Sequence, residues 1–148
     1  MIVPDSALVH EGTSQNYHPL ETERPRICPS RELTAALTQY CRNRDLDVKN
    51  RSVWTTDGIY RETPQKATYF KNAGAAAVEM ECSALFSVAA FHQKEIAALL
   101  IVSDILSISE KTPSQWQPSF RNPEFKAARK KACDIILDFA GDLSTHAQ

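Results

Sequence analysis

The sequence AVEMEC at residues 77–82, followed by AALLIVSD at residues 97–104, puts acids at the ends of two apolar runs. A buried carboxylate without a partner is costly, or its pKa rises until the group is neutral. Acids at the ends of two core strands therefore indicate a functional use. On a strand, Glu79 and Glu81 point to one side and Met80 to the other, so one face of this strand end is predicted to be acidic.

The composition is that of a single globular domain. The chain has 148 residues, is 43% hydrophobic and carries a formal net charge of −1, so we expect one domain over residues 1–148 with its own core. The balanced charge argues against nucleic acid as a partner. No apolar stretch approaches the ~20 residues that span a bilayer, and the first residues lack the features of a signal peptide. We therefore expect a cytoplasmic protein with no membrane partner.

The cysteines give no sign of a metal site or a disulfide framework. They are far apart, with no C-x-x-C pair and no histidines at zinc-ligand spacing. We expect no metal, and reduced, mostly buried thiols. His10 has no triad-like or metal-like partner in the sequence and is interpreted as a surface or structurally satisfied side chain.

Apolar strand patterns alternate with amphipathic helix patterns along the chain. The pattern predicts strands at 2–8, 48–55, 75–80 and 96–103, and helices beginning after Ser30, at 64–73, at 82–93 and from Pro123 to Gly141. Long polar loops are expected at 11–29 and 105–122. Ser30 and Thr63 are candidate helix N-caps, and Gly74 follows the second helix where a left-handed residue is needed.

This order of elements predicts an α/β layered fold with a parallel or mixed sheet covered on both faces. In such sheets, ligands bind outside the carboxyl ends of the strands. The acids Glu79, Glu81 and Asp104 and the turn at 56–58 all lie at predicted carboxyl ends. That edge of the sheet is the candidate site.

These same residues carry a family resemblance. The run at 77–81, its spacing to Val102-Ser103-Asp104, the loop at 11–14 and the segment at 56–63 resemble the nucleoside phosphorylase superfamily, which includes hexameric purine nucleoside phosphorylases and uridine phosphorylases. The resemblance covers nearly the whole chain. It implies a three-layer α/β fold with a central mixed sheet flanked by helices. It also implies cleavage of an N-glycosidic bond by phosphate, giving a free base and ribose 1-phosphate.

The resemblance also implies roles for individual residues. Met80 and Glu81 contact the ribose, with Glu81 on the two adjacent hydroxyls, and Glu79 supports the site. Asp104, beside Ser103, protonates a purine base at N7. The chemistry agrees, because one carboxylate can accept both ribose hydroxyl hydrogen bonds and an acid can assist a departing base. From the residues alone, Asp104 is equally a turn or cap residue, and Glu81 is an acid favoured by the dipole of the next helix.

The sequence departs from the family pattern at three places. Ile59, beside Tyr60, stands where the family often has a phenylalanine that stacks on the nucleoside, so both residues are assigned to the substrate site and the base preference stays open. The region 111–117 has no arginine, and Arg121 is the nearest. Nothing in the chain corresponds to the N-terminal strands of the family with their glycine-bearing phosphate loop, and only four glycines are present.

The chain therefore resembles the C-terminal, ribose-and-base half of a nucleoside phosphorylase, truncated at the N-terminus. We expect no cofactor, with phosphate as co-substrate, a nucleoside as ligand, and either a homo-oligomer or a complementing N-terminal chain. Three functions stay open. They are a phosphorylase completed by another chain, a nucleosidase of the methylthioadenosine type that uses water, and a non-catalytic nucleoside-binding remnant.

Overall fold

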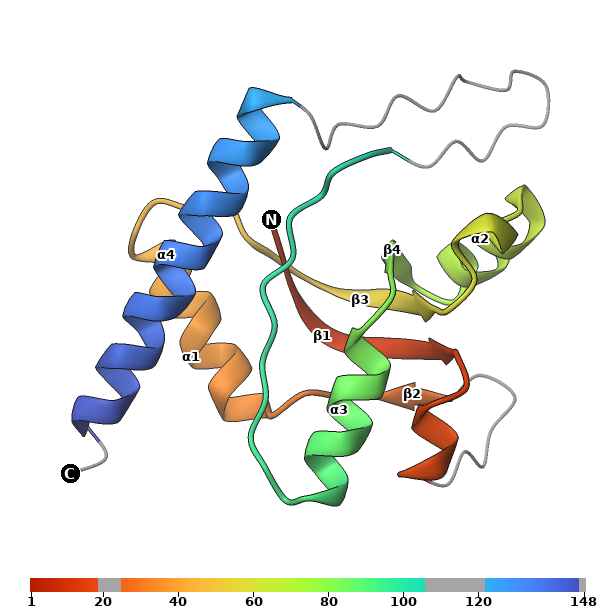
Figure 1. Ribbon diagram of the computed structural model, residues 1–148, viewed down its shortest axis with the longest axis horizontal. Helices are drawn as coiled ribbons and strands as arrows, with labels where there is room; N and C mark the ends of the chain where they lie inside the picture. The colour runs from red at the N-terminus through yellow and green to blue at the C-terminus, as the bar shows by residue number, and fades with distance from the viewer. Residues whose placement is uncertain (19–24, 106–121, 147–148) are drawn as a thin grey trace.

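One mixed sheet forms the centre of the protein. The computed structural model describes residues 1–18, 25–105 and 122–146. In this part of the chain the sheet has four strands in the order β2-β1-β3-β4 (Figure 1). Strands β1, β3 and β4 are parallel, and β2 runs antiparallel to β1. The strands are β1 (Ile2–His10), β2 (Arg26–Ile27), β3 (Lys49–Thr56) and β4 (Ala75–Glu79).

Helices cover both faces of this sheet, as the α/β prediction requires. The α-helices are α1 (Arg31–Arg42), α2 (Pro64–Asn72), α3 (Cys82–Phe91) and α4 (Pro123–His146), with short 3₁₀ turns η1 (Ser14–Asn16) and η2 (Ile59–Arg61). Helix α3 lies on one face, α1 and α2 lie on the other, and α4 packs outside α1 (Figure 1). The predicted mixed sheet flanked by helices is confirmed.

The alternation of side chains along β1 explains these layers. Ala7 and Val9 point to the face where Phe86 of α3 packs, and Leu8 points to the opposite face, where Phe70 of α2 packs. The pairing of β1 with β3 is irregular between Pro4 and Ser6. This irregularity shifts the alternation by one residue, so Val3 also faces the second layer, against α1 and α4.

Two of the predicted helix signals are confirmed and one acts differently. The hydroxyl of Thr63 accepts from the amide of Lys66 at 3.3 Å, and Gly74 has φ +101° just after α2. Ser30 is the N-cap residue of α1, but its hydroxyl makes no bond to that helix. It accepts instead from the amide of Ile96 at 2.7 Å, so it holds the chain after α3 beside the start of α1.

Two predicted boundaries are wrong. Helix α4 continues past Gly141 to His146, because a single glycine in an exposed helix costs only about 1 kcal/mol relative to alanine. The predicted strand at 96–103 is reduced to one antiparallel pair, Leu100 with Ile2, with N–O distances of 2.9 and 2.7 Å. The expected loop at 105–122 falls almost entirely outside the described residues, as do 111–117 and Arg121.

The predicted strand at 96–103 pairs with β1 over a single residue. A strand needs a neighbour with free backbone N–H and C=O groups. Strand β1 pairs with β3 along one side, and its Ala7 and Leu8 pair with β2 on the other. On this second side the segment after α3 pairs with Ile2 alone, and residues 3–6 of β1 have no strand partner among the described residues. Within the described residues, the outer edge of β4 is unpaired.

Arg26 ties this sheet to α2. Its guanidinium donates to the hydroxyls of Ser6 (2.8 Å) and Ser52 (3.0 Å) and to the carbonyl of Ala73 (3.0 Å).

All four cysteines are free thiols, of which Cys41 and Cys82 are buried and the other two are exposed, so the expectation of mostly buried thiols is half right. None of the described helices is long and apolar enough to cross a membrane.

The open edge of β4 predicts self-association, because an unpaired strand edge can pair with another chain. We expect the protein to associate in sedimentation experiments. Ala76→Lys puts a charge on the exposed part of β4 and should shift the distribution toward monomer. Ala140→Lys, the same change on the exposed side of α4, should leave it unaltered. A monodisperse wild-type monomer, or equal effects of the two variants, would contradict an association through β4.

Candidate active site

The carboxyl ends of the three parallel strands bring polar side chains to one edge of the sheet. Glu11 follows β1, Asp57 follows β3 and Glu79 ends β4. The amide of Gly12 donates to Asp57 at 3.3 Å, which joins the first two strand ends. The prediction that acids converge at the carboxyl edge is therefore correct for Asp57 and Glu79, and it did not include Glu11.

Glu79 caps helix α3 with its carboxylate. One oxygen accepts from the amides of Glu81 (2.8 Å) and Cys82 (2.7 Å), and the other accepts from the hydroxyl of Thr55 on β3. The first amides of a helix have no partner within the helix, and the helix dipole favours a negative charge there. In each of these contacts Glu79 accepts a hydrogen bond, so both oxygens of its carboxylate are already engaged by donors within the protein.

Met80 and Glu81 lie in the turn between β4 and α3. The strand ends at Glu79, so the expected alternation that would put Glu79 and Glu81 on one acidic strand face does not extend to Glu81. Glu81 is the N-cap residue of α3, yet its side chain makes no capping bond. Its side chain is exposed, and Met80 is 39% exposed. Both side chains are presented at the carboxyl edge while Glu79 holds the backbone beneath them.

Glu11 forms a second carboxylate centre under the start of α3. It accepts from the amide of Thr13 (2.5 Å), from the amide and hydroxyl of Ser14, and from the hydroxyl of Ser83 on α3 (2.8 Å). The amide of Ser83 donates in turn to the hydroxyl of Thr55 at 3.0 Å. Ser14, Thr55 and Ser83 are fully buried. The two carboxylates are thus linked through Ser83 and Thr55.

Burial and hydrogen bonding act on Glu11 in opposite directions. Burial favours the neutral form, but the hydrogen bonds donated by Ser14, Ser83 and Thr13 favour the charged form and outweigh it. The pKa of Glu11 therefore lies below its ordinary value. The carboxylate is held as an acceptor by its neighbours.

Ile59 and Tyr60 lie in η2, directly after the turn at 56–58. The hydroxyl of Thr56 accepts from the amide of Gly58 at 3.2 Å, which closes the predicted turn. Ile59 is 48% exposed and Tyr60 is 98% exposed. Both residues assigned to the substrate site thus lie beyond the carboxyl end of β3 with their side chains open to a ligand.

Ser103 and Asp104 are not held at this edge by strand pairing. The hydroxyl of Ser103 donates to the carboxylate of Asp104 at 2.7 Å, and both residues are half-buried. The segment is anchored at Leu100, which pairs with Ile2. Ile2 lies about 26 Å along β1 from His10, at ~3.3 Å per residue. The sheet therefore gathers Glu79 and Glu81 at one end and fixes the run leading to Asp104 at the other.

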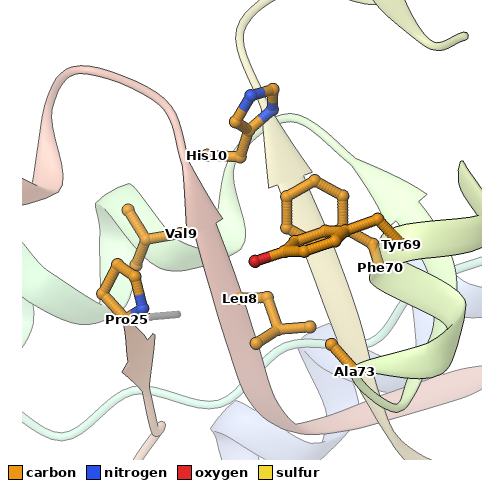
Figure 2. A pocket seen from close by; sticks show the side chains of 7 residues that line it. All are labelled: Leu8, Val9, His10, Pro25, Tyr69, Phe70 and Ala73. Carbon is orange, nitrogen blue, oxygen red and sulfur yellow. The ribbon is translucent and has the colours of Figure 1, made fainter. Parts of the chain in front are cut away.

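A small cavity lies beside β1 on the α2 side of the sheet. Its volume is about 150 Å³. Figure 2 shows the aromatic rings of Tyr69 and Phe70 on one side and Val9 and Pro25 on the other. His10 also lines the cavity. Burial and the charge of Lys66 lower the pKa of His10, and Asp57 acts in the opposite direction. No residue predicted for the nucleoside site lines this cavity, whose lining is Leu8, Val9, His10, Pro25, Tyr69, Phe70 and Ala73.

Sequence reasoning missed the buried hydroxyls of Thr55 and Ser83. Glu11 entered only as part of a motif, without a role. A signal was present, because Thr55 ends a buried strand and Ser83 lies in the first turn of an apolar helix, where hydroxyls commonly bond to backbone or carboxylates. In the part of the chain that the structure describes, no group of histidine, cysteine and acidic side chains is arranged to hold a metal ion.

The comparison with protein families now gives the class of protein. A sequence model of the phosphorylase superfamily matches residues 1–140, so the chain belongs to that superfamily. The purine nucleoside phosphorylase DeoD-type of Brevibacillus brevis is 31% identical over 97 residues, which are 66% of this chain and 41% of the relative. The protein of the same description from Colwellia psychrerythraea is 38% identical over 86 residues, covering 58% of this chain and 35% of the relative.

Solved structures agree with this assignment. The AMP nucleosidase of Bacteroides thetaiotaomicron matches with a TM-score of 0.62 and 28% identity, over 70% of this chain and 44% of that one. The P. knowlesi homolog of P. falciparum PNP matches with a TM-score of 0.55 and 16% identity, over 65% of this chain and 39% of that one, and supports the fold alone. The chain thus spans about two fifths of the length of these relatives.

The pKa of Glu11 predicts how stability depends on pH. Because that pKa is lowered in the folded state, the contribution of Glu11 is complete above the ordinary glutamate value of about 4.3 and is lost as the pH falls through the folded value. Glu11→Gln should lower the free energy of unfolding near neutral pH, and its difference from wild type should shrink below about pH 4. Urea unfolding at several pH values measures this. Glu95→Gln, an exposed control, should show no such difference, and a pH-independent effect of Glu11→Gln would contradict the prediction.

Proposed function

We propose that this chain carries the ribose-and-base half of an enzyme that cleaves the N-glycosidic bond of nucleosides, with phosphate as co-substrate. The observation that supports it most is the turn between β4 and α3. Glu79 is engaged by backbone amides and by Thr55, while the side chain of Glu81 is exposed and makes no capping bond to α3. A carboxylate presented in this way suits a polar ligand at the carboxyl edge.

Ribose is the part of the substrate that this turn fits. Its adjacent hydroxyls are donors, and one carboxylate accepts both in a charge-assisted pair. Glu81 takes this role, and the half-exposed thioether of Met80 packs against the sugar. Ile59 and Tyr60 border the base, where an aromatic side chain contributes about 0.5–1.5 kcal/mol by stacking. Glu79 contributes indirectly, since it fixes the backbone that carries Glu81.

Asp104 is the proposed proton donor to the departing base. Bond cleavage leaves negative charge on the base, and general acid assistance contributes on the order of 10²–10⁴-fold. The hydroxyl of Ser103 orients the carboxyl group. The segment after α3 is antiparallel to β1 at Leu100, so residues 101–104 lead away from the carboxyl edge. For Asp104 to act together with Glu81, this segment has to take a different path. We propose that contact with a complementing chain or a second copy of this chain sets that path.

Hydrolysis is the second candidate, and a specific observation favours it. One solved structure that this chain resembles at 28% identity is described as an AMP nucleosidase. A nucleosidase uses water in place of phosphate as the nucleophile. A third possibility is a nucleoside-binding remnant without catalysis. Release of base from inosine and uridine, measured with and without phosphate, separates the three.

The role of Glu81 predicts a sugar-dependent loss of binding. Glu81→Gln should weaken binding of ribonucleosides far more than of 2′-deoxyribonucleosides, because only ribose uses the full charge-assisted pair. Stability should change little, since glutamine has the same size. Titration with inosine and 2′-deoxyinosine measures this, with Glu95→Gln as a control of the same chemistry. Equal losses for both sugars would remove the ribose assignment.

The isolated chain should be a poor catalyst even if Asp104 acts as proposed. If the groups that bind phosphate lie on another chain, the nucleophile is not positioned in this one, and positioning can supply ~7–11 kcal/mol. We expect phosphorolysis at least about 10³-fold below that of a complete site. The N-terminal part of a DeoD-type relative, added as a separate chain, should restore activity. Robust phosphorolysis by the chain alone would show that it carries a phosphate site of its own.

In the restored enzyme, Asp104→Asn tests the base assignment. It should abolish cleavage of purine but not of pyrimidine nucleosides, because only the purine is protonated at N7. Asp138→Asn on the exposed side of α4 makes the same change away from the site and should leave both activities unaltered. An equal loss for purines and pyrimidines would contradict proton donation by Asp104.

A further inference from the structure

The start of α3 is clamped to two strands at once by Ser83. The amide of Ser83 donates to the hydroxyl of Thr55 on β3 at 3.0 Å. Its hydroxyl donates to the carboxylate of Glu11, just after β1, at 2.8 Å. Ser83 and Thr55 are fully buried, so water does not compete for the bond between them, while the bond to the half-buried Glu11 is partly shielded. The two hydrogen bonds of Ser83 therefore fix the position and orientation of the first turn of α3 at the carboxyl edge of the sheet.

Glu11, Thr55 and Ser83 together form this clamp, and the carboxylate of Glu11 is held in place by its own loop. Both of its oxygens receive hydrogen bonds from the loop that follows β1, including amide donors at Thr13 and Ser14. Backbone amides cannot reverse their polarity, so this position requires an acceptor. The hydroxyl of Ser83 then finds a charged partner already held in place, and a charge-assisted hydrogen bond is stronger than a neutral one.

The clamp ends on the backbone of Glu81. Thr55, whose oxygen is engaged by the Ser83 amide, donates its hydroxyl proton to Glu79. Glu79 accepts from the amides of Glu81 and Cys82. A shift of the first turn of α3 would therefore move the residue that leads into it.

We propose that Glu11 is a positioning residue for Glu81. It acts through Ser83 and the first turn of α3, and it sets where the Glu81 carboxylate meets the two ribose hydroxyls. The part that concerns ribose rests on the proposed function, whereas the clamp itself does not. Two hydroxyls held by one carboxylate demand close alignment, so a displaced first turn costs ribose recognition before it costs binding in general.

The first test measures the clamp without any ligand. Amide hydrogen exchange of Glu81 and Cys82 reports whether Glu79 still holds them. Ser83→Ala removes the hydroxyl that reaches Glu11. Ser87→Ala is the matched control, because Ser87 is a buried serine one turn further along α3 whose hydroxyl has no hydrogen-bond partner among the described residues. Ser83→Ala and Glu11→Ala should each lower the protection of both amides by about tenfold, and Ser87→Ala should not.

The second test measures the consequence for the sugar. Titrations give the ratio of the Kd values for inosine and 2′-deoxyinosine. In the wild type this ratio should favour inosine by at least about tenfold, as expected for a hydrogen bond to a charged group. Glu11→Ala should bring the ratio close to one, and Glu11→Gln, which keeps the shape and one acceptor oxygen, should retain more of it. A purely structural role would weaken both ligands equally and leave the ratio unaltered.

The outcomes separate the two ideas. Unchanged exchange of Glu81 and Cys82 in Ser83→Ala and Glu11→Ala overturns the positioning role, and so does an unchanged Kd ratio in a wild type that discriminates the sugars. Faster exchange in these variants supports the clamp. If exchange is faster but the wild-type protein does not distinguish the sugars, Glu81 is not the ribose ligand and the proposed function fails, while the clamp stands. Should Glu11→Ala not fold, the pair Ser83→Ala and Ser87→Ala decides.

Discussion

The carboxylate of Glu79 at the start of α3 is the interaction on which the candidate site depends. It satisfies two helix amides that have no partner inside the helix, at 2.8 and 2.7 Å, and it is held from β3 by Thr55. Without it, the turn between β4 and α3 would carry unsatisfied amides next to a buried helix end, which is costly. With it, the backbone of the turn is fixed, and the two side chains between strand and helix are presented outward.

Glu79 and Glu81 are close in sequence but have different roles, because one carboxylate is engaged by the protein and the other is exposed. Glu79 ends a strand and turns inward to the helix amides, while Glu81 occupies the cap position and leaves its carboxylate exposed. The structural acid stabilises the protein, and the exposed acid is available to a ligand. Glu11 repeats the pattern after β1, two strands away in the sheet, where its carboxylate is also engaged by donors of the protein itself.

Local signals in the sequence were sufficient for most of the fold. Thr63 with Pro64, and Gly74 after α2, bracket a helix through contacts within a few residues, and these are found as predicted. The apolar alternation of β1 determined which helices pack on which face. The turn at 56–58 and the carboxyl edge followed from the parallel order of the strands. The roles of Thr55 and Ser83 could not be predicted, because their partners lie 28 and 72 residues away.

The segment at 96–103 failed as a strand for a different reason. Its apolar, β-branched sequence is suited to a buried strand, and its core-facing side chains do pack, with Ile96, Ala98 and Leu100 against the layer beneath α3. Among the described residues it pairs with β1 at Ile2 alone, while β2 pairs with Ala7 and Leu8 on the same side of β1. The residues of a segment can favour a strand, but the hydrogen-bonded ladder also depends on how the segment lies against a neighbouring strand. Asp104 therefore depends on strand pairing in a way that Glu81 does not, because Glu81 is positioned by the helix that follows it.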